Sequence, residues 1–296
     1  MSRLVLIDGN AILHRAYHAI PHLTDKKGRA TNALYGFISI LLNLITNLRP
    51  THLTVCFDEK EKTFRKKDFA AYQAKRPPMD ERLSSQIGLT KDFLKSADIL
   101  FYSKGGYEAD DIIGTLVKQA RVDEIIIITG DRDIFQLITD KVRVFTPTRG
   151  REGKLWGREE VKADFDFEPI QMIDYKALVG DTSDNYPGVF GIGPKTARDL
   201  IVKYQTIENI YQRLGEIDEK TRVKLEKGKK EAFFFHQIAT IFNQVPVNFN
   251  MQKCADWNLG SNKALGFMEE MGFKSLLVRI RKGGAEKLSQ EQMNLL

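Results

Sequence analysis

Cysteine is nearly absent from this chain, whose 296 residues include only Cys56 and Cys254. Two cysteines so far apart in the sequence do not indicate a disulfide framework or a cysteine-rich zinc site. Histidine is also scarce, with five residues, and no cluster of histidine and cysteine stands out. A metal site in this chain is therefore expected to use oxygen ligands.

Long apolar runs are absent as well. The opening residues, MSRLVLIDGN, are apolar over only four positions before Asp8, which is too short for a secretory signal peptide. No run reaches the length that crosses a membrane. With 42% hydrophobic and 28% charged residues, the composition is that of a globular protein with one large or two smaller domains. We therefore expect a cytoplasmic protein, and nothing in the sequence indicates more than a monomer.

Strands and helices alternate through the first half of the chain. Short apolar runs predict buried strands at 3–8, 52–58, 99–102 and 124–129, and a last strand at 141–146. Helical spacing of apolar residues predicts helices at 31–48, 80–96 (capped by Asp80) and 108–121. Asp133 and Gln136 match a capping box at the start of a further helix. The alternation predicts an α/β fold with a mostly parallel sheet flanked by helices.

The pattern changes near residue 168, after which no strand is predicted and helices follow one another. We interpret residues 1–168 as an α/β core and residues 169–284 as a helical domain. Residues 285–296 are polar and are interpreted as a frayed end or the start of a linker.

Acidic residues stand at one predicted edge of the sheet. Two of them end the first two strands, two follow the strand at 124–129, three begin the helix at 108–121, and two lie in GDTSDN at 180–185. In open α/β sheets, binding sites form outside the carboxyl ends of the strands. We therefore expect nine carboxylates to gather there: Asp8, Asp58, Glu108, Asp110, Asp111, Asp131, Asp133, Asp181 and Asp184.

Any one of these acids is adequately explained as a helix cap or a turn residue. A cap needs one carboxylate, however, and the stretch GYEADD at 106–111 supplies three. At ~4 Å, each pair of like charges costs about 1 kcal/mol in water and about 4 kcal/mol at an effective dielectric near 20. Hard divalent cations relieve this repulsion, and Mg²⁺ and Mn²⁺ prefer carboxylate and water oxygens. The cluster therefore predicts bound Mg²⁺ or Mn²⁺.

The chemistry that such a site supports is phosphoryl transfer. Two ions about 4 Å apart stabilise the attacking and leaving oxygens of an in-line displacement. No constellation of Ser, Cys and His accompanies the acids, so water is the expected nucleophile and phosphodiester hydrolysis the expected reaction. Outside the nine acids, 30 acidic residues face 45 basic ones, a surplus of 15 positive charges that suits a polyanionic substrate.

Two further segments are suited to nucleic acid. In GVFGIGPKTARDLI (188–201), Gly191 and Gly193 lack the context of a dinucleotide fingerprint or a P-loop. We interpret this segment as a glycine turn before a helix that starts at Pro194, with its amides, Lys195 and Thr196 facing a DNA phosphate. A purely structural turn between helices is the alternative. In residues 60–82, basic residues interleaved with aromatics suit a single strand, and a solvated charged helix is the alternative.

Together these stretches resemble the 5′ nuclease domain at the N-terminus of bacterial DNA polymerase I, which is akin to flap endonucleases. The resemblance runs from Arg3 to about Gly283 and is most specific in LIDGN, CFD, GYEADD, TGDRD and LVGDTSDNYPGVFGIGPKTA. It implies that all nine carboxylates are metal-binding. It also implies that Arg15, Arg65 and Arg76 contact the substrate near the scissile phosphate.

The resemblance further implies an arch over the site, at about residues 60–100, through which a 5′ single strand passes. Residues 188–200 match the helix–hairpin–helix of the family, which grips duplex backbone, often with a bound K⁺.

One residue departs from the family pattern. The family often has Tyr-Lys-x-x-Arg in the arch, whereas this chain has Tyr72, Gln73 and then Lys75 and Arg76. If residues 62–76 form a helix, Tyr72, Lys75 and Arg76 lie on one face. We therefore expect Lys75 to take the place of the missing lysine beside the scissile phosphate.

The sequence thus predicts a Mg²⁺-dependent, structure-selective 5′ nuclease that hydrolyses DNA at flaps, nicks and RNA primers in replication and repair. Two alternatives remain open: a junction-binding protein without activity, and a PIN-like RNase. Whether a polymerase domain follows residue 296 is also open.

Overall fold

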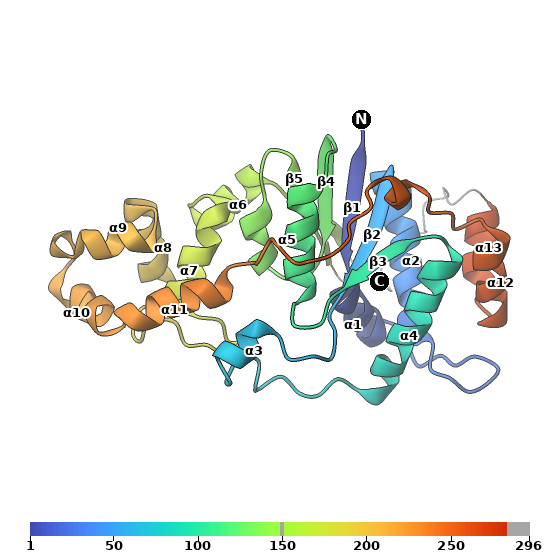
Figure 1. Ribbon diagram of the computed structural model, residues 1–296, viewed down its shortest axis with the longest axis horizontal. Helices are drawn as coiled ribbons and strands as arrows, with labels where there is room; N and C mark the ends of the chain where they lie inside the picture. Colours follow the sequence, from blue (N-terminus) through green and yellow to red (C-terminus); the bar gives the residue numbers. More distant parts are fainter. Residues whose placement is uncertain (149–150, 283–296) are drawn as a thin grey trace.

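The computed structural model of the protein describes residues 1–148 and 151–282. Its centre is a six-stranded sheet in the order β3-β2-β1-β4-β5-β6 (Figure 1). The strands are β1 (Arg3–Asp8), β2 (His52–Phe57), β3 (Leu100–Ser103), β4 (Glu124–Ile128), β5 (Val142–Thr148) and β6 (Arg151–Trp156). β1 to β5 are parallel and β6 is antiparallel to β5. The predicted mostly parallel α/β fold is therefore confirmed.

The prediction that the strand at 141–146 is the last one was wrong, because β6 follows it. β6 has the sequence REGKLW, with few apolar residues, and it lies at the edge of the sheet. An edge strand of this kind does not show the continuous apolar pattern by which a buried parallel strand is recognised.

Both faces of the sheet are covered, and the side chains of β1 alternate between them. Leu4 and Leu6 pack in one cluster with α5 (Ala109–Gln119). Val5 and Ile7 pack in the other cluster, with α1 (Gly9–Ala19) and α2 (Asn32–Leu48). Burial on both faces explains why the strands are apolar without interruption.

The helices predicted at 31–48, 80–96 and 108–121 are all present, with ends that differ by at most two residues. Asp80 caps α4 through a hydrogen bond from the Arg82 amide, as predicted. The helix expected at 108–121 is α5, with Glu108 at its cap. The α-helices are α1 (Gly9–Ala19), α2 (Asn32–Leu48), α3 (Phe64–Asp68), α4 (Glu81–Ser96), α5 (Ala109–Gln119), α6 (Arg158–Phe165), α7 (Met172–Val179), α8 (Pro194–Tyr204), α9 (Ile207–Gln212), α10 (Glu219–Lys227), α11 (Lys229–Ala239), α12 (Asn262–Glu270) and α13 (Lys274–Arg281).

The four short 3₁₀ helices are η1 (Asp133–Leu137), η2 (Pro169–Gln171), η3 (Leu214–Glu216) and η4 (Gln252–Ala255). The capping box expected at Asp133 and Gln136 is not formed. Instead, the Asp133 amide donates to the Asp131 carboxylate, and the Gln136 side chain donates to backbone carbonyls of Asp133 and Ala239. Gln136 is thus used to hold the end of α11 against η1.

The segment from α3 to α4 crosses in front of the carboxyl ends of the strands (Figure 1). Residues 62–76 do not form one helix, which was the condition for placing Tyr72, Lys75 and Arg76 on one face: α3 ends at Asp68, and turns follow. Gln73 has a φ of 55°, a left-handed conformation that ends any helical run. The single-face argument for Tyr72, Lys75 and Arg76 therefore does not hold.

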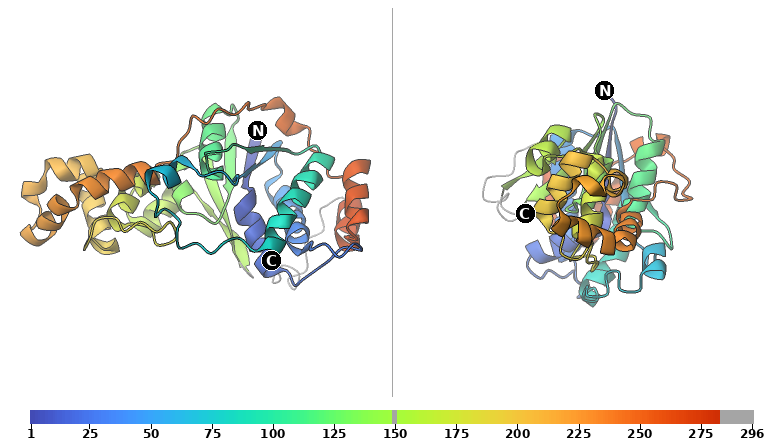
Figure 2. Two further views of the ribbon diagram at one scale, coloured as in Figure 1. Left: turned by 60° about the horizontal axis from the view of Figure 1, so that its bottom comes forward. Right: turned by 90° about the vertical axis from the view of Figure 1, so that its left-hand side faces the viewer.

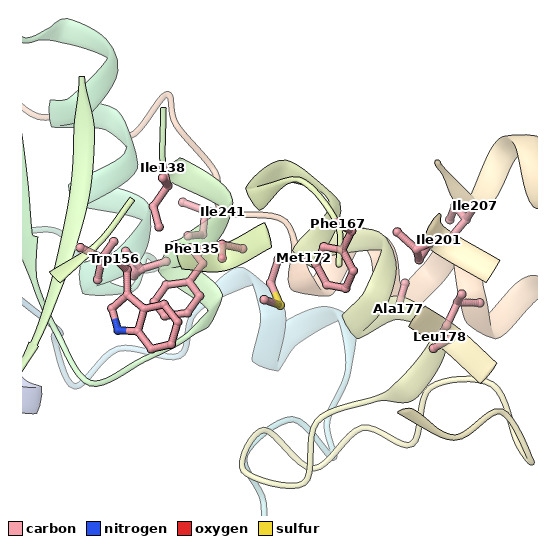
Figure 3. Packing of buried hydrophobic residues seen from close by; sticks show 14 of the residues in the cluster. Phe135, Ile138, Trp156, Phe167, Met172, Ala177, Leu178, Ile201, Ile207 and Ile241 are labelled. Atoms are coloured by element: carbon pink, nitrogen blue, oxygen red, sulfur yellow. The ribbon is translucent and has the colours of Figure 1, made fainter. Parts of the chain in front are cut away.

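Helices α7 to α11 form a lobe that projects from one end of the sheet (Figures 1 and 2). One apolar cluster connects the two parts, from Phe135 and Trp156 through Met172 to Ile201 (Figure 3). The chain then returns along the sheet, and α12 and α13 join the cluster of α2 and α4 on the far side. Many of the residues from 241 to 282 therefore pack with the α/β part, although they come after the proposed domain division at 168.

The predicted tail, residues 285–296, lies outside the described residues. Among the residues that the structure describes, no helix has both the length and the apolar character needed to cross a membrane.

Candidate active site

A cavity of about 1210 Å³ lies at the carboxyl-terminal edge of the sheet, under the segment from α3 to α4. Eight of the nine predicted acids line it: Asp8, Asp58, Glu108, Asp110, Asp131, Asp133, Asp181 and Asp184. They come from the ends of β1, β2 and β4, from the start of α5, and from the loop after α7. The topology brings them together because parallel strands all end at the same edge.

β1, β2 and α5 fix one side of this acidic cavity. Asp8 ends β1 and caps α1, and one of its oxygens accepts a hydrogen bond of 2.9 Å from the Thr129 hydroxyl. Asp58 follows β2 and accepts from the Ala109 amide at 2.8 Å, which ties it to the first turn of α5. No described residue donates a hydrogen bond to the carboxylate of Asp110, which lines the cavity beside them.

The segment after β4 and the loop after α7 fix the other side. Asp131 and Asp133 follow β4, and the Asp133 amide donates to the Asp131 carboxylate at 2.9 Å. In the loop after α7, the Asp181 carboxylate accepts from the amides of Ser183 and Asp184 at 2.7 and 3.1 Å. This turn directs the carboxylate of Asp184 into the same cavity.

The acids raise one another's pKa values. Burial first, and the charge of Asp58 second, raise the pKa of Asp8 from 3.8 to about 7. Burial raises the pKa of Glu108 to about 7, and burial with the Asp131 charge raises that of Asp133 to about 7. The pKa of Asp110 is raised well above its usual value by burial and by Asp131. Without a counter-charge, these carboxylates therefore bind protons readily at neutral pH.

Side-chain cations already neutralise the side of the cavity near α7. The Lys176 ammonium lies 2.7 Å from Asp133 and also pairs with Asp181. Burial opposes ionisation of Asp181, but the hydrogen bonds from Lys176 and Ser183 outweigh it and lower the pKa of Asp181. Arg76 pairs with Asp184 at 2.6 Å. The side formed by β1, β2 and α5 has no such cation within the cavity among the described residues, apart from the contact of Arg65 with Glu108.

The donor set fits hard divalent cations. All eight lining acids offer oxygen ligands, and Asp110 offers a carboxylate that no described residue neutralises. Within the described ranges, no three His, Cys, Asp or Glu side chains converge closely enough to chelate one ion. Mg²⁺ is suited to such an arrangement because it keeps several waters and binds through one or two carboxylates together with substrate phosphate.

Comparison with known proteins identifies the family of the chain. A family profile described as "5'-3' exonuclease, N-terminal resolvase-like domain" matches residues 3–166, and one described as "5'-3' exonuclease, C-terminal SAM fold" matches residues 167–260. A 5'-3' exonuclease of Aquifex aeolicus is 34% identical over 285 residues, which cover 95% of this chain and 96% of that protein. The chain belongs to the 5'-3' exonuclease family. The resemblance drawn from the sequence is thereby confirmed.

Polymerases contain a related segment. DNA polymerase I of Caldicellulosiruptor bescii is 39% identical over 285 residues, which cover 94% of this chain and 33% of that protein. The chain thus spans about a third of the length of the polymerases that it matches. Among solved structures, a flap endonuclease of bacteriophage T5 in complex with DNA and metal ions has a TM-score of 0.69 at 20% identity, covering 93% of this chain and 99% of that one. At this identity the likeness concerns the fold alone.

Two residues expected from the 5'-3' exonuclease family do not line the cavity. Asp111 is fully buried, and its carboxylate points away from the cavity to a bidentate pair with Arg65. Arg15 lies on α1, where Ala11, His14 and His18 line the cavity instead. Sequence position alone placed these side chains at the edge of the sheet without fixing which way they turn.

The other arch residues do meet the acids. The buried Tyr72 hydroxyl lies 3.0 Å from a carboxylate oxygen of Asp184 and 3.2 Å from one of Glu108, and it can donate its single proton to either. Burial together with the Glu108 charge raises the pKa of Tyr72. Gln73 donates to Asp184 at 3.1 Å, beside Arg76. Gln73 therefore points toward the acids, together with Arg76. Lys75 is exposed and lines the cavity, and it forms no ion pair with a described residue.

The hairpin residues lie apart from this cavity. α8 begins at Pro194 with Gly193 at its cap, as predicted. Gly191 has a φ of 81°, whereas Gly193 has a φ of −93° and open space where a Cβ would stand. A left-handed conformation is therefore required at Gly191 and not at Gly193. Lys195 is exposed and Thr196 is half-buried, so both side chains can contact a ligand that binds at the N-terminus of α8.

Lys176 is the main residue that the sequence did not reveal. It lies in the last turn of α7, five positions before Asp181, within the stretch YKALVGD. A lone lysine at this spacing gives no motif, and its role depends on the return of the loop that follows α7. Its proximity to the GDTSDN acids was the only available signal.

Proposed function

We propose that this chain hydrolyses phosphodiester bonds in DNA at junctions between a 5′ single strand and a duplex, with two divalent ions. The observation that carries the proposal is the convergence of eight carboxylates from separate segments on one cavity. The chain's membership of the 5'-3' exonuclease family supports the same reaction.

The carboxylates divide into two groups around Asp131. Asp131 is the charged neighbour with the largest effect on the pKa of Asp110, and it also interacts with Asp181 and Asp184. We propose that one ion binds in the group of Asp8, Asp58, Glu108, Asp110 and Asp131, and the other in the group of Asp131, Asp133, Asp181 and Asp184. Each ion would bind one or two carboxylates of its group directly and the others through water. When bound, such ions supply positive charge for the reacting phosphate and lower the pKa of water.

The side chains of the arch would orient the substrate. Lys75 is an exposed cation at the cavity and forms no ion pair with a described residue, so it is the proposed partner of a phosphate oxygen. Arg76 is paired with Asp184. If a metal ion binds the Asp184 carboxylate in its place, Arg76 would be released to contact a phosphate of the substrate. Tyr72 and Gln73 hold Asp184 by hydrogen bonds and thereby keep its oxygens directed into the cavity. Arg15 is proposed to act on a strand that passes beside the cavity.

The hairpin before α8 would bind the duplex. Gly191 and Gly193 allow close approach of a phosphate to the start of the helix, and Lys195 and Thr196 are placed to contact it. We also propose that a K⁺ ion binds at this turn. The substrates are 5′ flaps, nicks and RNA primers, in replication and repair in the cytoplasm. The chain is proposed to act as a monomer or as part of a polymerase.

The test is cleavage of three end-labelled substrates, 5′-flap DNA, duplex DNA and single-stranded RNA, in Mg²⁺, Mn²⁺ and chelator. The proposal predicts metal-dependent cutting of the flap near its junction, leaving a 5′-phosphate. Tight flap binding without cutting would identify a junction-binding protein. Preference for the RNA would identify an RNase.

A further inference from the structure

Asp111 and Arg65 form a pair at the wall of the cavity, which Arg65 lines and Asp111 does not. The carboxylate oxygens of Asp111 accept from both terminal nitrogens of Arg65 at 2.8 Å. The exposed fractions of the two side chains are 0% for Asp111 and 3% for Arg65. The family resemblance assigns Asp111 to a metal and Arg65 to the substrate, and this geometry suits neither role.

The Asp111 carboxylate has no acceptor capacity left. One oxygen accepts from Arg65 and from the Phe242 amide at 2.9 Å, and the other accepts from Arg65 and from the Glu108 amide at 3.1 Å. A carboxylate offers about four lone-pair sites. To bind a metal, Asp111 would have to release the guanidinium of Arg65, whose side chain is almost fully buried.

The Arg65 guanidinium has no donor left either. Besides Asp111, it donates to Glu108 at 3.2 Å and to the carbonyls of Ile238 and Thr240 at 2.8 Å each. A guanidinium has five N–H donors, and all five are used here. Arg65 therefore cannot reach a phosphate without breaking contacts in the interior.

These bonds join three segments that are distant in the sequence. Arg65 lies in α3 at the start of the arch, Asp111 lies in the first turn of α5, and residues 238–242 end α11 and begin the return of the chain. The residue before Asp111 is Asp110, and the amide that Asp111 holds belongs to Glu108. Both of these neighbours line the cavity.

We propose that Asp111 is a positioning residue: with Arg65 it forms a brace that fixes Glu108 and Asp110 relative to the arch and to the end of α11. It contacts neither metal nor substrate. The inference rests on the proposed function in so far as Glu108 and Asp110 are metal ligands. The fixed neighbours of a ligand commonly affect metal affinity by about 10–100-fold.

The adjacent acids Asp110 and Asp111 allow a matched test, in which the same change to asparagine is made at each position in turn: Asp110→Asn and Asp111→Asn. Thermal unfolding of the metal-free chain and calorimetric titration with Mn²⁺ are measured for both. Asp110→Asn is expected to leave the melting temperature unchanged or raised, because it removes a repelled charge, and to lose one of two Mn²⁺ ions. Asp111→Asn is expected to melt lower by about 6 °C or more and to keep both ions, bound about tenfold or more weakly.

Two results would overturn the brace. Loss of one ion by Asp111→Asn, with wild-type melting, would make Asp111 a ligand. Lower melting with wild-type Mn²⁺ affinity would make the pair a stabilising contact without a positioning role. If Asp111→Asn does not fold, Arg65→Lys serves as the same test, because lysine keeps the positive charge but cannot form the bidentate pair of hydrogen bonds with Asp111. Wild-type Mn²⁺ affinity in Arg65→Lys refutes the brace, and weaker binding of both ions supports it.

The same experiment separates this inference from the proposed function. If Asp110→Asn keeps two Mn²⁺ ions and wild-type cleavage of a 5′ flap, the proposed metal centre fails. If Asp110→Asn behaves as expected and Asp111→Asn matches it, the brace alone fails.

Discussion

The raised pKa values of the acidic cavity predict an unusual dependence of stability on pH. In the metal-free chain, Asp8 has a pKa of about 7, compared with 3.8 for an ordinary aspartate. A carboxyl group whose folded pKa is raised favours the folded state most below its unfolded pKa. That contribution is lost as the pH rises through about 7.

The size of the effect follows from proton linkage. Between about pH 5 and pH 8, a shift of this size lowers the free energy of unfolding by about 2–3 kcal/mol for one group. Glu108 and Asp133 are shifted to about 7 in the same direction, so the metal-free chain loses several kcal/mol in total. His14 acts in the opposite direction, because burial and the neighbouring His18 and Arg76 lower its pKa. A single imidazole does not offset several carboxyl groups.

The assay is thermal unfolding of chelator-treated protein across this pH range, with and without saturating Mg²⁺. We expect the metal-free melting temperature to fall by at least about 5 °C from pH 5 to pH 8, at about 2 °C per kcal/mol. Mg²⁺ should restore stability at pH 8 and have little effect at pH 5, where protons occupy the acids. In Asp8→Asn, the decrease in the free energy of unfolding of the metal-free chain from pH 5 to pH 8 should be smaller by about 2–3 kcal/mol. A metal-free melting temperature that stays level or rises with pH would refute the reasoning.

Three further predictions concern the cations and the hairpin. Lys176→Met should increase the affinity for the more weakly bound of two Mn²⁺ ions by about tenfold in calorimetry, because one competing cation is removed. Unchanged affinity would show that Lys176 does not compete with the ions for the acids. Gly191→Val should weaken binding of substrates with a long downstream duplex more than Gly193→Val, because only Gly191 has a positive φ; equal binding losses for the two variants would contradict this. Lys75→Ala should lower single-turnover cleavage of a flap by about 10²-fold and Gln73→Ala should do little; a mild Lys75→Ala, with faster cleavage by Gln73→Lys, would end the assignment of Lys75.

The sequence was sufficient to predict the strands and the gathering of the acids. Both follow from periodicity and from the rule that parallel strands end at a common edge, so Asp8, Asp58 and Asp131 could be placed before the structure was known. The direction of a side chain in the first turn of a helix does not follow from these rules. Asp110 and Asp111 are neighbours of one type, and only the packing of Arg65 and residues 238–242 decides which of them turns inward.

The arch was the least predictable part for a similar reason. The charged and aromatic residues at 60–82 suit a helix by composition, but contacts with the loop after α7 determine their conformation. The Gln73 amide donates to the Asp184 carbonyl, and the Asn185 side chain donates to the Ala71 carbonyl. These partners are more than a hundred residues away in the sequence, so local spacing could not reveal them.

The central claim is that the acids around Asp131 hold the ions that cut DNA, while other contacts provide most of the binding. Its most direct test is single-turnover cleavage of one 5′-flap substrate in Mg²⁺ by the wild-type chain and by Asp131→Ala, together with binding of the same flap in Ca²⁺. The account predicts that the wild type cleaves, and that Asp131→Ala does not cleave yet largely keeps its affinity for the flap, because phosphate contacts elsewhere dominate affinity. Wild-type turnover by Asp131→Ala in Mg²⁺ would contradict the account.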